Sequence, residues 1–299
     1  RGATLESNGA MRGSMAAVED AVLVAGGIGS RMLPASASIA KEALPLVDIP
    51  ALSHLAREAV EAGAKRIHII TSPSKSFEGL LKDNNWLHEK RPEISREILS
   101  PFNDVEVIVH VQQVAKGFGD ALSCALHAVQ GPFMVLLGDN ILLDTFSSST
   151  DYTASNASKI LVDAYQKTNL PCVGLAAVND PQNYGVVSME GNLVKEIIEK
   201  PNPEQSPSNL VLCGRYIFTE DTSDLLEKYN FEDYGELQSI AIQQHWMQNK
   251  GLVGVELNGF QWYDSGAPLP WLKSQIDYAL RREDMRDEIR DWLEDRLQR

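Results

Sequence analysis

Short apolar runs alternate with stretches of helical periodicity through the first half of the chain. In "PALSHLAREAVEAG", apolar residues recur at the spacing of one helical face, and Gly63 ends the segment. This alternation predicts strands over residues 21–25, 66–72, 105–113 and 133–140, and helices over 50–63, 75–83 and 119–129. Strands that are separated by helices pair in parallel, with helices on both faces of the sheet.

The second half contains strand-like apolar runs with little helix between them. Gly191-Asn192 separates two of these runs and predicts a hairpin turn. The predicted strands cover 172–178, 184–190, 193–201, 210–219 and 252–259, the predicted helices cover 223–229 and 235–249, and one or two amphipathic helices follow in 268–299. The whole pattern predicts an α/β protein with a Rossmann-like, mixed but mostly parallel sheet, flanked by helices and followed by a C-terminal helical tail.

The same pattern sets the expected domain boundaries. We expect one domain over residues 16–280 and a helical tail over 281–299, because no internal repeat or low-complexity linker divides the chain. Residues 1–15 are small and polar, which predicts a disordered extension, and Met15 is a plausible natural start. A charged insertion over residues 84–104 interrupts the alternation and is expected to be partly helical.

Composition and charge exclude several classes of partner. The 299 residues carry a formal net charge of −14, which argues against a nucleic-acid binder because such proteins need a basic surface. No apolar run approaches the ~20 residues of a membrane helix, and no signal peptide is visible, so we expect no membrane partner. Cys124, Cys172 and Cys213 lack metal-ligand spacing and are expected to be reduced, buried thiols in a cytoplasmic protein.

One glycine-rich stretch, "AGGIGSRMLPASASIAKEALP", follows the first predicted strand, at the sheet edge where open α/β proteins bind ligands. Gly26, Gly27 and Gly29 let backbone N–H groups approach a phosphate, and Arg31 and Lys41 add positive charge. The spacing fits neither a Walker P-loop nor a dinucleotide fingerprint, which needs a third glycine and an immediate helix. The stretch predicts a long phosphate-binding loop, with a glycine-rich surface turn as the alternative.

Further motifs follow this loop in the order "VQQVAKGFGDAL", "LLGDN", "YGVV", "EKPNPEQSPSNL", "GRYIF" and "GELQ". With the loop, this ordered set resembles the sugar-1-phosphate nucleotidylyltransferases, and it is most similar to the bacterial glucose-1-phosphate uridylyltransferases. The resemblance extends over residues 18–280. It implies the nucleotide-diphospho-sugar transferase fold, with the nucleotide over the first half of the sheet and the sugar phosphate over the second half.

The resemblance also implies a reaction. A uridylyl group would pass from UTP to glucose 1-phosphate, giving UDP-glucose and pyrophosphate, with Mg²⁺ as cofactor. A phosphate oxygen of the sugar phosphate attacks the α-phosphorus in line, and it is already ionised at neutral pH. Positioning and charge neutralisation should therefore supply most of the rate. We also expect a homo-oligomer.

Five charged residues would carry this reaction, as the resemblance implies. Arg31 would hold the nucleotide phosphates and the departing pyrophosphate, and Lys41 would bridge phosphates near the reacting centre. Asp139 in "LGDN" and Asp264 in "WYDSG" would coordinate Mg²⁺. This ion is well bound by a small number of protein carboxylates together with several phosphate oxygens. Lys200 in "EKP" would bind the sugar phosphate. For the last three, an ordinary strand-end or turn role is the alternative.

The other implied site residues contact the sugar or the nucleotide. Glu199 would accept hydrogen bonds from sugar hydroxyls, and Gly185 and Asn209 would complete the sugar site. Gln113 would read a pyrimidine edge with its amide group, or serve as an ordinary edge-strand residue. Contacts to the nucleotide are expected from Ala25, Gly26, Gly27, Gly29 and Gly117.

Departures from the family pattern keep other functions open. Ala37 stands where uridylyltransferases carry a second loop lysine, and Ala40 replaces a proline. "LGDN" and "WYDSG" look more like the related thymidylyltransferases, so transfer from dTTP is the main alternative. A nucleotide-sugar-binding regulator without turnover is a second alternative. A Rossmann dehydrogenase is disfavoured, because the second strand ends in "IITSPSKS", without an acidic residue for ribose hydroxyls.

Overall fold

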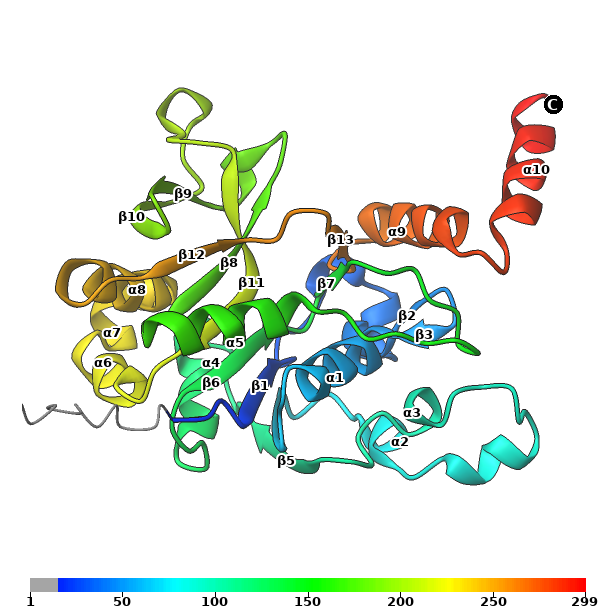
Figure 1. Ribbon diagram of the computed structural model, residues 1–299, viewed down its shortest axis with the longest axis horizontal. Coiled ribbons are helices and arrows are strands. Elements are labelled where there is room, and N and C mark those ends of the chain that lie inside the picture. The colour runs from blue at the N-terminus through cyan, green and yellow to red at the C-terminus, as the bar shows by residue number, and fades with distance from the viewer. Residues whose placement is uncertain (1–15) are drawn as a thin grey trace, which may run out of the picture.

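The computed structural model describes residues 16–299, so the predicted disordered extension lies outside the described residues. The strands of its main sheet are β1 (Asp20–Val24), β4 (Arg66–Thr71), β5 (Glu106–Val111), β6 (Phe133–Leu137), β8 (Cys172–Ala177), β9 (Gly185–Glu190), β10 (Leu193–Glu199), β11 (Leu210–Phe218) and β12 (Val253–Glu256). They form a nine-stranded sheet in the order β5-β4-β1-β6-β11-β8-β12-β10-β9 (Figure 1).

The sheet is parallel in its first half and mixed in its second half, as the sequence predicts. β1 pairs in parallel with β4 and β6, and β4 pairs in parallel with β5. β11 then runs antiparallel to both β6 and β8, and β9 and β10 form the expected hairpin around Gly191. Along β1, Val22 lies opposite His68 on one side and Val135 on the other.

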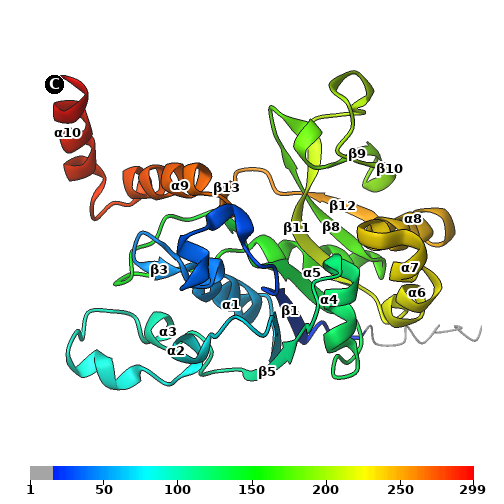
Figure 2. The ribbon, with the colours of Figure 1, turned by 180° about the vertical axis from the view of Figure 1, so that it is seen from behind.

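Helices cover both faces of the sheet (Figures 1 and 2). The side chains of β1 alternate between the two apolar cores that lie under these helices. Leu23 faces a core that contains α1 (Ala51–Glu61) and α5 (Ala157–Thr168). Val22 faces the opposite core, where α4 (Gly117–Leu126), α6 (Thr222–Lys228) and α8 (Gln238–Asn249) pack. Burying one such aliphatic side chain stabilises the fold by about 1.5–3 kcal/mol.

Two small sheets lie beside the main one. β2 (Pro45–Leu46) pairs with β3 (Ile49–Pro50), and β7 (Asn140–Leu143) pairs with β13 (Gln261–Asp264). Leu46, Ile141 and Tyr263 from these strands pack against Tyr278 of α9 (Pro268–Arg281) in a third apolar cluster. The sequence pattern predicts neither β7 nor β13 as a strand.

Two predicted helices differ from the structure, and one long helix is not predicted. The helix expected over 75–83 is reduced to α2 (Glu78–Leu81), because residues 72–75 form a turn in which the Lys75 side chain points inward. The helix expected over 235–249 begins only at 238, since Gly235 ends α7 (Phe231–Tyr234) with a positive φ of 56° and a short 3-10 turn intervenes. α5 is not predicted. Within the charged insertion, α3 (Arg96–Leu99) confirms partly helical structure.

The chain ends in two helices, α9 and, within the predicted tail, α10 (Arg286–Leu297). α9 packs against β13, whereas α10 has no buried residue and stands away from the sheet in Figure 1. Between them, Arg282 is buried and forms ion pairs with Asp48 and Asp284. None of the helices within residues 16–299 combines the length and the apolar character that crossing a membrane requires.

Candidate active site

A cavity of about 980 Å³ opens where the carboxyl ends of β6 and β10 meet the start of β9. Its position agrees with the rule that open α/β sheets bind ligands beyond the carboxyl ends of their strands. The predicted site residues that line it are Arg31, Asp139, Gly185, Glu199, Lys200 and Asp264. Side chains from distant parts of the sequence therefore share one cavity.

The β7–β13 pair brings the two predicted metal-binding aspartates together. Asp139 lies in the turn between β6 and β7, and Asp264 is the last residue of β13. Asp264 is paired with Asn140 in the strand register, and the N–H of Ser265 donates to the carbonyl of Asp139 at 3.2 Å. The two carboxylates are thus fixed through the backbone of a small sheet.

Gly266 leaves the space into which these carboxylates and Arg31 converge. A Cβ at this position would lie 2.9 Å from Asp264 Oδ1, 3.0 Å from Arg31 Nη2 and 3.6 Å from Asp139 Oδ2. The Gly266 N–H also donates to Asp264 Oδ1 at 2.6 Å. Sequence reasoning did not place this glycine in the site. The signal was its residue type, because a glycine directly after "WYDS" leaves space beside Asp264 that a side chain would fill.

Lys41 joins the same group from the glycine-rich loop. Its Nζ donates to Asp139 Oδ2 at 2.6 Å, and its side chain is 11% exposed. Lys41 is held in a short 3-10 turn (Lys41–Ala43), and its stem runs past Gly29, whose added Cβ would lie 3.5 Å from Lys41 Cδ. The cation and the carboxylate neutralise each other in the absence of substrate.

The predicted sugar side of the site is built by the β9–β10 hairpin. Gly185 and Glu199 are opposite each other in the strand register, and a Cβ on Gly185 would lie 3.1 Å from Glu199 Oε2. Lys200 follows with a positive φ of 45°, and its N–H donates to the Tyr184 carbonyl at 2.9 Å. Its side chain is 68% exposed, so its ammonium can reach a ligand in the cavity.

Three aromatic residues line this cavity, Tyr184, Tyr216 and Trp262, and the sequence analysis did not place them in the site. The rings of Tyr184 and Trp262 lie 5.1 Å apart at an interplanar angle of 47°. Trp262 Nε1 donates to Asn140 Oδ1 at 2.8 Å, and Asn140 Nδ2 donates to Asp139 Oδ1 at 3.3 Å. Burial raises the pKa of the Tyr184 hydroxyl, with Asp264 adding to the shift. Asn140 therefore links the Trp262 ring to the Asp139 carboxylate through hydrogen bonds.

Gln113 and Asn209 do not line the cavity, and both residues are exposed. The other predicted residues outside its lining are Lys41, Ala25, Gly26, Gly27, Gly29 and Gly117. The neighbouring Gln112 is buried instead. Its Nε2 donates to Asp120 Oδ2 at 2.6 Å, and its Oε1 lies 3.1 Å from the position of a Cβ on Gly26. Side-chain alternation along β5 is the signal that points to Gln112, because His110, two residues earlier, is also buried.

The predicted backbone contacts lie around the end of β1. Ala25 is buried, with its N–H bonded to the Ile70 carbonyl at 2.8 Å. Gly26 is buried, whereas nothing lies within 4 Å of a Cβ placed on Gly27, so that backbone faces open space. Gly29 and Gly117 have positive φ angles of 73° and 87°, which favour glycine.

The donor set fits a hard divalent cation that also binds substrate. Within residues 16–299, no three His, Cys, Asp or Glu side chains gather as a metal site. Asp139 and Asp264 alone converge, beside Gly266. Mg²⁺ is commonly held by one or two carboxylates together with substrate phosphates and water, which is the arrangement that two converging acids allow.

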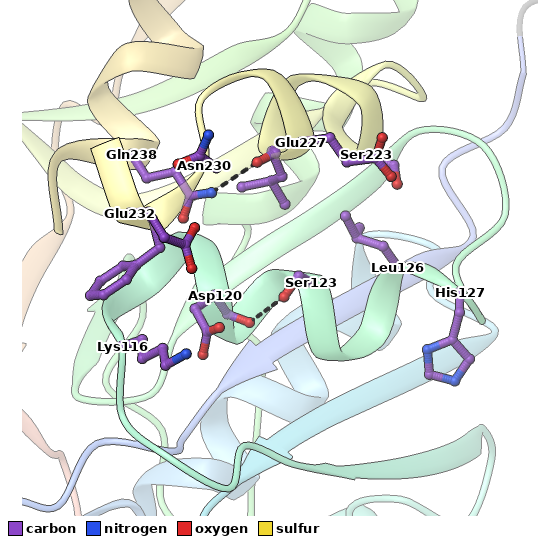
Figure 3. Close-up of a pocket in the computed structure, with 12 residues that line it drawn as sticks. Lys116, Asp120, Ser123, Leu126, His127, Ser223, Glu227, Asn230, Glu232 and Gln238 are labelled. Carbon is purple, nitrogen blue, oxygen red and sulfur yellow. Dashed lines mark hydrogen bonds between the residues drawn. The ribbon is translucent and has the colours of Figure 1, made fainter. Parts of the chain in front are cut away.

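A separate cavity of about 420 Å³ lies between α4, α6, α7 and α8 and contains none of the predicted site residues. Figure 3 shows Asp120 of α4 and Glu232 of α7 facing it, with Lys116 beside Asp120. Its acidic lining does not suit a polyphosphate. The larger cavity, which combines cations and acids, is the better candidate for the active site.

Comparison with known proteins agrees with this geometry. The sequence profile of the family described as "Nucleotidyl transferase" matches residues 20–279. A UTP–glucose-1-phosphate uridylyltransferase of Streptococcus pneumoniae serotype 4 is 30% identical over 290 residues, covering 92% of this chain and 95% of that relative. A protein of the same name from Streptococcus pyogenes is 30% identical over 293 residues, covering 93% and 94%.

Solved structures give the same result. A UDP-glucose pyrophosphorylase from Acinetobacter baumannii is similar with a TM-score of 0.77 and 29% identity, covering 93% of this chain and 99% of that one. A UTP-bound structure of the enzyme from that species has a TM-score of 0.76 and 29% identity, covering 92% and 98%. Because the family profile spans most of the chain and these relatives cover more than nine-tenths of it, the protein belongs to the nucleotidyl transferase family.

Proposed function

We propose that this protein transfers a uridylyl group from UTP to glucose 1-phosphate, giving UDP-glucose and pyrophosphate. One observation carries the proposal: Arg31, Asp139 and Asp264 converge around Gly266 in a cavity that Lys200 also lines, and Lys41 contacts Asp139. Cations and acids in one cleft suit a reaction between two phosphorylated substrates. The names of the relatives and the UTP bound to one structural neighbour support the choice of substrates.

In the proposed reaction, a phosphate oxygen of glucose 1-phosphate forms a bond to the α-phosphorus of UTP. The bond from the α-phosphorus to the bridging oxygen breaks, and pyrophosphate leaves with that electron pair. The nucleophile needs no general base, because a phosphate monoester is ionised at neutral pH. The enzyme has to bring two anions together and to stabilise charge on the leaving group.

We assign the two ends of the cavity to the two substrates. Arg31 and Lys41 bind the UTP phosphates, and Lys200 binds the phosphate of glucose 1-phosphate. Glu199 accepts hydrogen bonds from sugar hydroxyls, and the Trp262 ring packs beside the sugar. These roles are supported by the polarity of each side chain, by the cavity that Arg31, Glu199, Lys200 and Trp262 line, and by the contact of Lys41 with Asp139.

Asp139 and Asp264 would hold Mg²⁺, which would neutralise phosphate charge and orient the nucleotide when bound. Lys41 contacts Asp139 Oδ2 in the absence of substrate, and we expect this contact to weaken if the carboxylate also held a cation. The Lys41 ammonium then becomes available to a phosphate oxygen.

We further propose a cytoplasmic location, supported by the buried free thiols of Cys172 and Cys213.

Pyrophosphate release tests the proposal directly. Purified protein is mixed with Mg²⁺, each of UTP, dTTP, CTP, ATP and GTP, and each of several sugar 1-phosphates. We expect the highest kcat/KM for UTP with glucose 1-phosphate, and loss of turnover when a chelator removes the metal. Some turnover of dTTP is compatible with this result, because one buried methyl group discriminates by only ~1–3 kcal/mol.

Other outcomes of the same matrix contradict the proposal. A higher kcat/KM for dTTP than for UTP identifies a thymidylyltransferase. Nucleotide binding without pyrophosphate release from any pair identifies a binding protein. Asp139→Asn provides the control for the site, because it should lower activity and weaken the response to Mg²⁺ together.

A further inference from the structure

A second lysine, Lys75, lies behind the candidate active site and outside the cavity. It follows β4 in the loop after the second parallel strand, and its side chain is only 6% exposed. Its Nζ donates to the Ala25 carbonyl at 2.8 Å and to the Glu42 oxygens at 2.8 Å and 3.0 Å. The three ammonium protons therefore have three acceptors, all within the protein.

Glu42 connects this lysine to the active site. Its side chain is 1% exposed, and its Oε1 lies 4.0 Å from Lys41 Nζ. Lys41 in turn contacts Asp139 at 2.6 Å. Lys75, Glu42, Lys41 and Asp139 thus form one row of alternating charges that runs from the interior to the cavity.

The two lysines compete for one buried carboxylate. Burial raises the pKa of Glu42 above its ordinary value, while the charges of Lys75 and Lys41 oppose that shift. Burial also lowers the pKa of Lys75, and Glu42 opposes this. A buried carboxylate that loses its partner is strongly destabilised and draws in any available cation. Without Lys75, the nearest ammonium to Glu42 in the described structure is that of Lys41.

We propose that Lys75 is a positioning residue that satisfies Glu42 so that Lys41 stays available to substrate phosphate. The Ala25 carbonyl fixes the Lys75 ammonium in place, and the bidentate contact to Glu42 neutralises that carboxylate. Lys41 is then drawn toward the cavity by Asp139 and, in the complex, by phosphate. The inference rests on the proposed function, because it assigns Lys41 to the phosphates.

A double-mutant cycle over Lys75→Met and Glu42→Gln tests this role. Lys75→Met alone should lower kcat by about 100-fold, because a misplaced catalytic group costs a rate factor of this order. The double variant should regain at least about 10-fold of that loss, since no buried charge is left to withdraw Lys41. Lys82→Met, which removes the lysine of an exposed ion pair with Glu78, should change kcat by less than about 2-fold.

Thermal unfolding of each variant separates catalysis from folding. If Lys75→Met alone does not fold, the comparison is made in the Glu42→Gln background. There, adding Lys75→Met should change kcat by less than about 3-fold, since the charge that Lys75 neutralises is already absent. A fall of about 100-fold in that background, or a Lys75→Met variant with normal kcat, overturns the role of Lys75.

The proposed function and the positioning role of Lys75 are refuted by different results. If the wild-type protein releases no pyrophosphate with any substrate pair, the proposed function is refuted. If the wild-type protein turns over UTP and glucose 1-phosphate, but the folded single and double Lys75 variants are equally slow, the positioning role alone is refuted. Partial recovery of kcat in the double variant supports both.

Discussion

At the scale of single residues, the site is organised by charges that neutralise one another without substrate. Lys41 contacts Asp139, and Arg31 lies with Asp264 around the space left by Gly266. The Lys41–Asp139 ion pair, with Arg31 beside the carboxylates, places cations next to acids before any ligand binds. Substrate and metal would exchange these partners, so charge neutralisation is built in before binding.

Gly266→Ala should damage this arrangement selectively. The new Cβ would lie 2.9 Å from Asp264 Oδ1 and 3.0 Å from Arg31 Nη2, so these groups must shift. We expect kcat to fall about 100-fold with a small change in melting temperature, because the shift affects reacting groups and not the core. Gly79→Ala is the control, since nothing lies within 4 Å of its added Cβ. Equal kcat values for the two variants would remove Gly266 from the site.

A buried histidine makes stability depend on pH. His54 is 2% exposed, and burial lowers its pKa from 6.5 to about 4, with the charge of Arg282 adding to the shift and that of Asp48 opposing it. The unfolded chain therefore binds a proton that the folded chain rejects. The free energy of unfolding should decrease as pH falls from about 6.5 toward 4, by up to ~1.4 kcal/mol per pH unit for one histidine.

Urea unfolding at several pH values tests this prediction. His54→Phe should reduce the slope by about one proton between pH 6.5 and 5, because phenylalanine fits among Tyr152 and Tyr278 without titrating. His110, 7% exposed, should retain its own contribution in that variant, since burial also lowers its pKa to about 4. An unchanged slope in His54→Phe contradicts the assignment.

At the scale of elements, one buried ion pair ties several elements to the active site. Arg215 of β11 contacts Glu58 of α1 at 2.7 Å and 2.9 Å, and both side chains are buried. Arg215 Nη2 also donates to the Asn140 carbonyl at 2.8 Å, next to Asp139. Ser158 of α5 donates to Glu58 at 2.6 Å. The position of β7 therefore depends on contacts deep in the core.

Arg215→Met should destabilise the protein by about 3–5 kcal/mol, because it leaves a buried carboxylate without its partner. Lys159→Ala is the control, since Lys159 of α5 forms an exposed ion pair with Glu61, which lies on the same helix as Glu58. It should cost at most about 0.5 kcal/mol. Denaturant unfolding measures both. Similar values for the two variants would show that the buried pair does not hold these elements together.

The limits of sequence reasoning are also clearest at this scale. The motif order predicts that Arg31, Asp139, Lys200 and Asp264 share one site, and the structure places them in one cavity. Their roles in binding remain predictions. The β7–β13 pair could not be predicted, because two four-residue strands that lie over one hundred residues apart carry no local signal for pairing.

Other differences arise from short-range geometry. Only the strict in-and-out alternation of β5 could tell the buried Gln112 from the exposed Gln113. That alternation is a weak guide here, because β5 ends at Val111, just before both residues. α5 was missed although Leu161, Val162 and Tyr165 share its buried face. The polar residues around these three apolar positions made the amphipathic pattern difficult to recognise from the sequence.

At the scale of the whole molecule, the tail differs from the body. We propose that the main domain ends with α9, close to the predicted boundary at residue 280, because α10 has no buried residue. Leu269, Leu272 and Ile276 recur at helical spacing and are exposed on α9, and Trp292 and Leu297 are exposed on α10. We propose that these side chains contact a second copy of the chain in a homo-oligomer.

Light scattering after size exclusion tests the oligomer. We expect a mass of at least twice the 33.0 kDa of one chain. Trp292→Glu should shift it toward the monomer, because it places a charge in the apolar surface. Trp86→Glu is the control, since Trp86 is 62% exposed on the charged insertion and not on the tail. A monomeric wild-type protein, or an unchanged mass in Trp292→Glu, contradicts this proposal.

We claim that one cavity at the strand ends holds both phosphates of the product, between Lys200 and the pair formed by Arg31 and Lys41. A crystal structure with UDP-glucose and Mg²⁺ tests it most directly. The claim predicts the diphosphate between the Arg31–Lys41 end and Lys200, with the metal on Asp139 and Asp264. A diphosphate bound elsewhere, for example in the cavity between α4 and α7, with these side chains pointing away from it, would contradict the account.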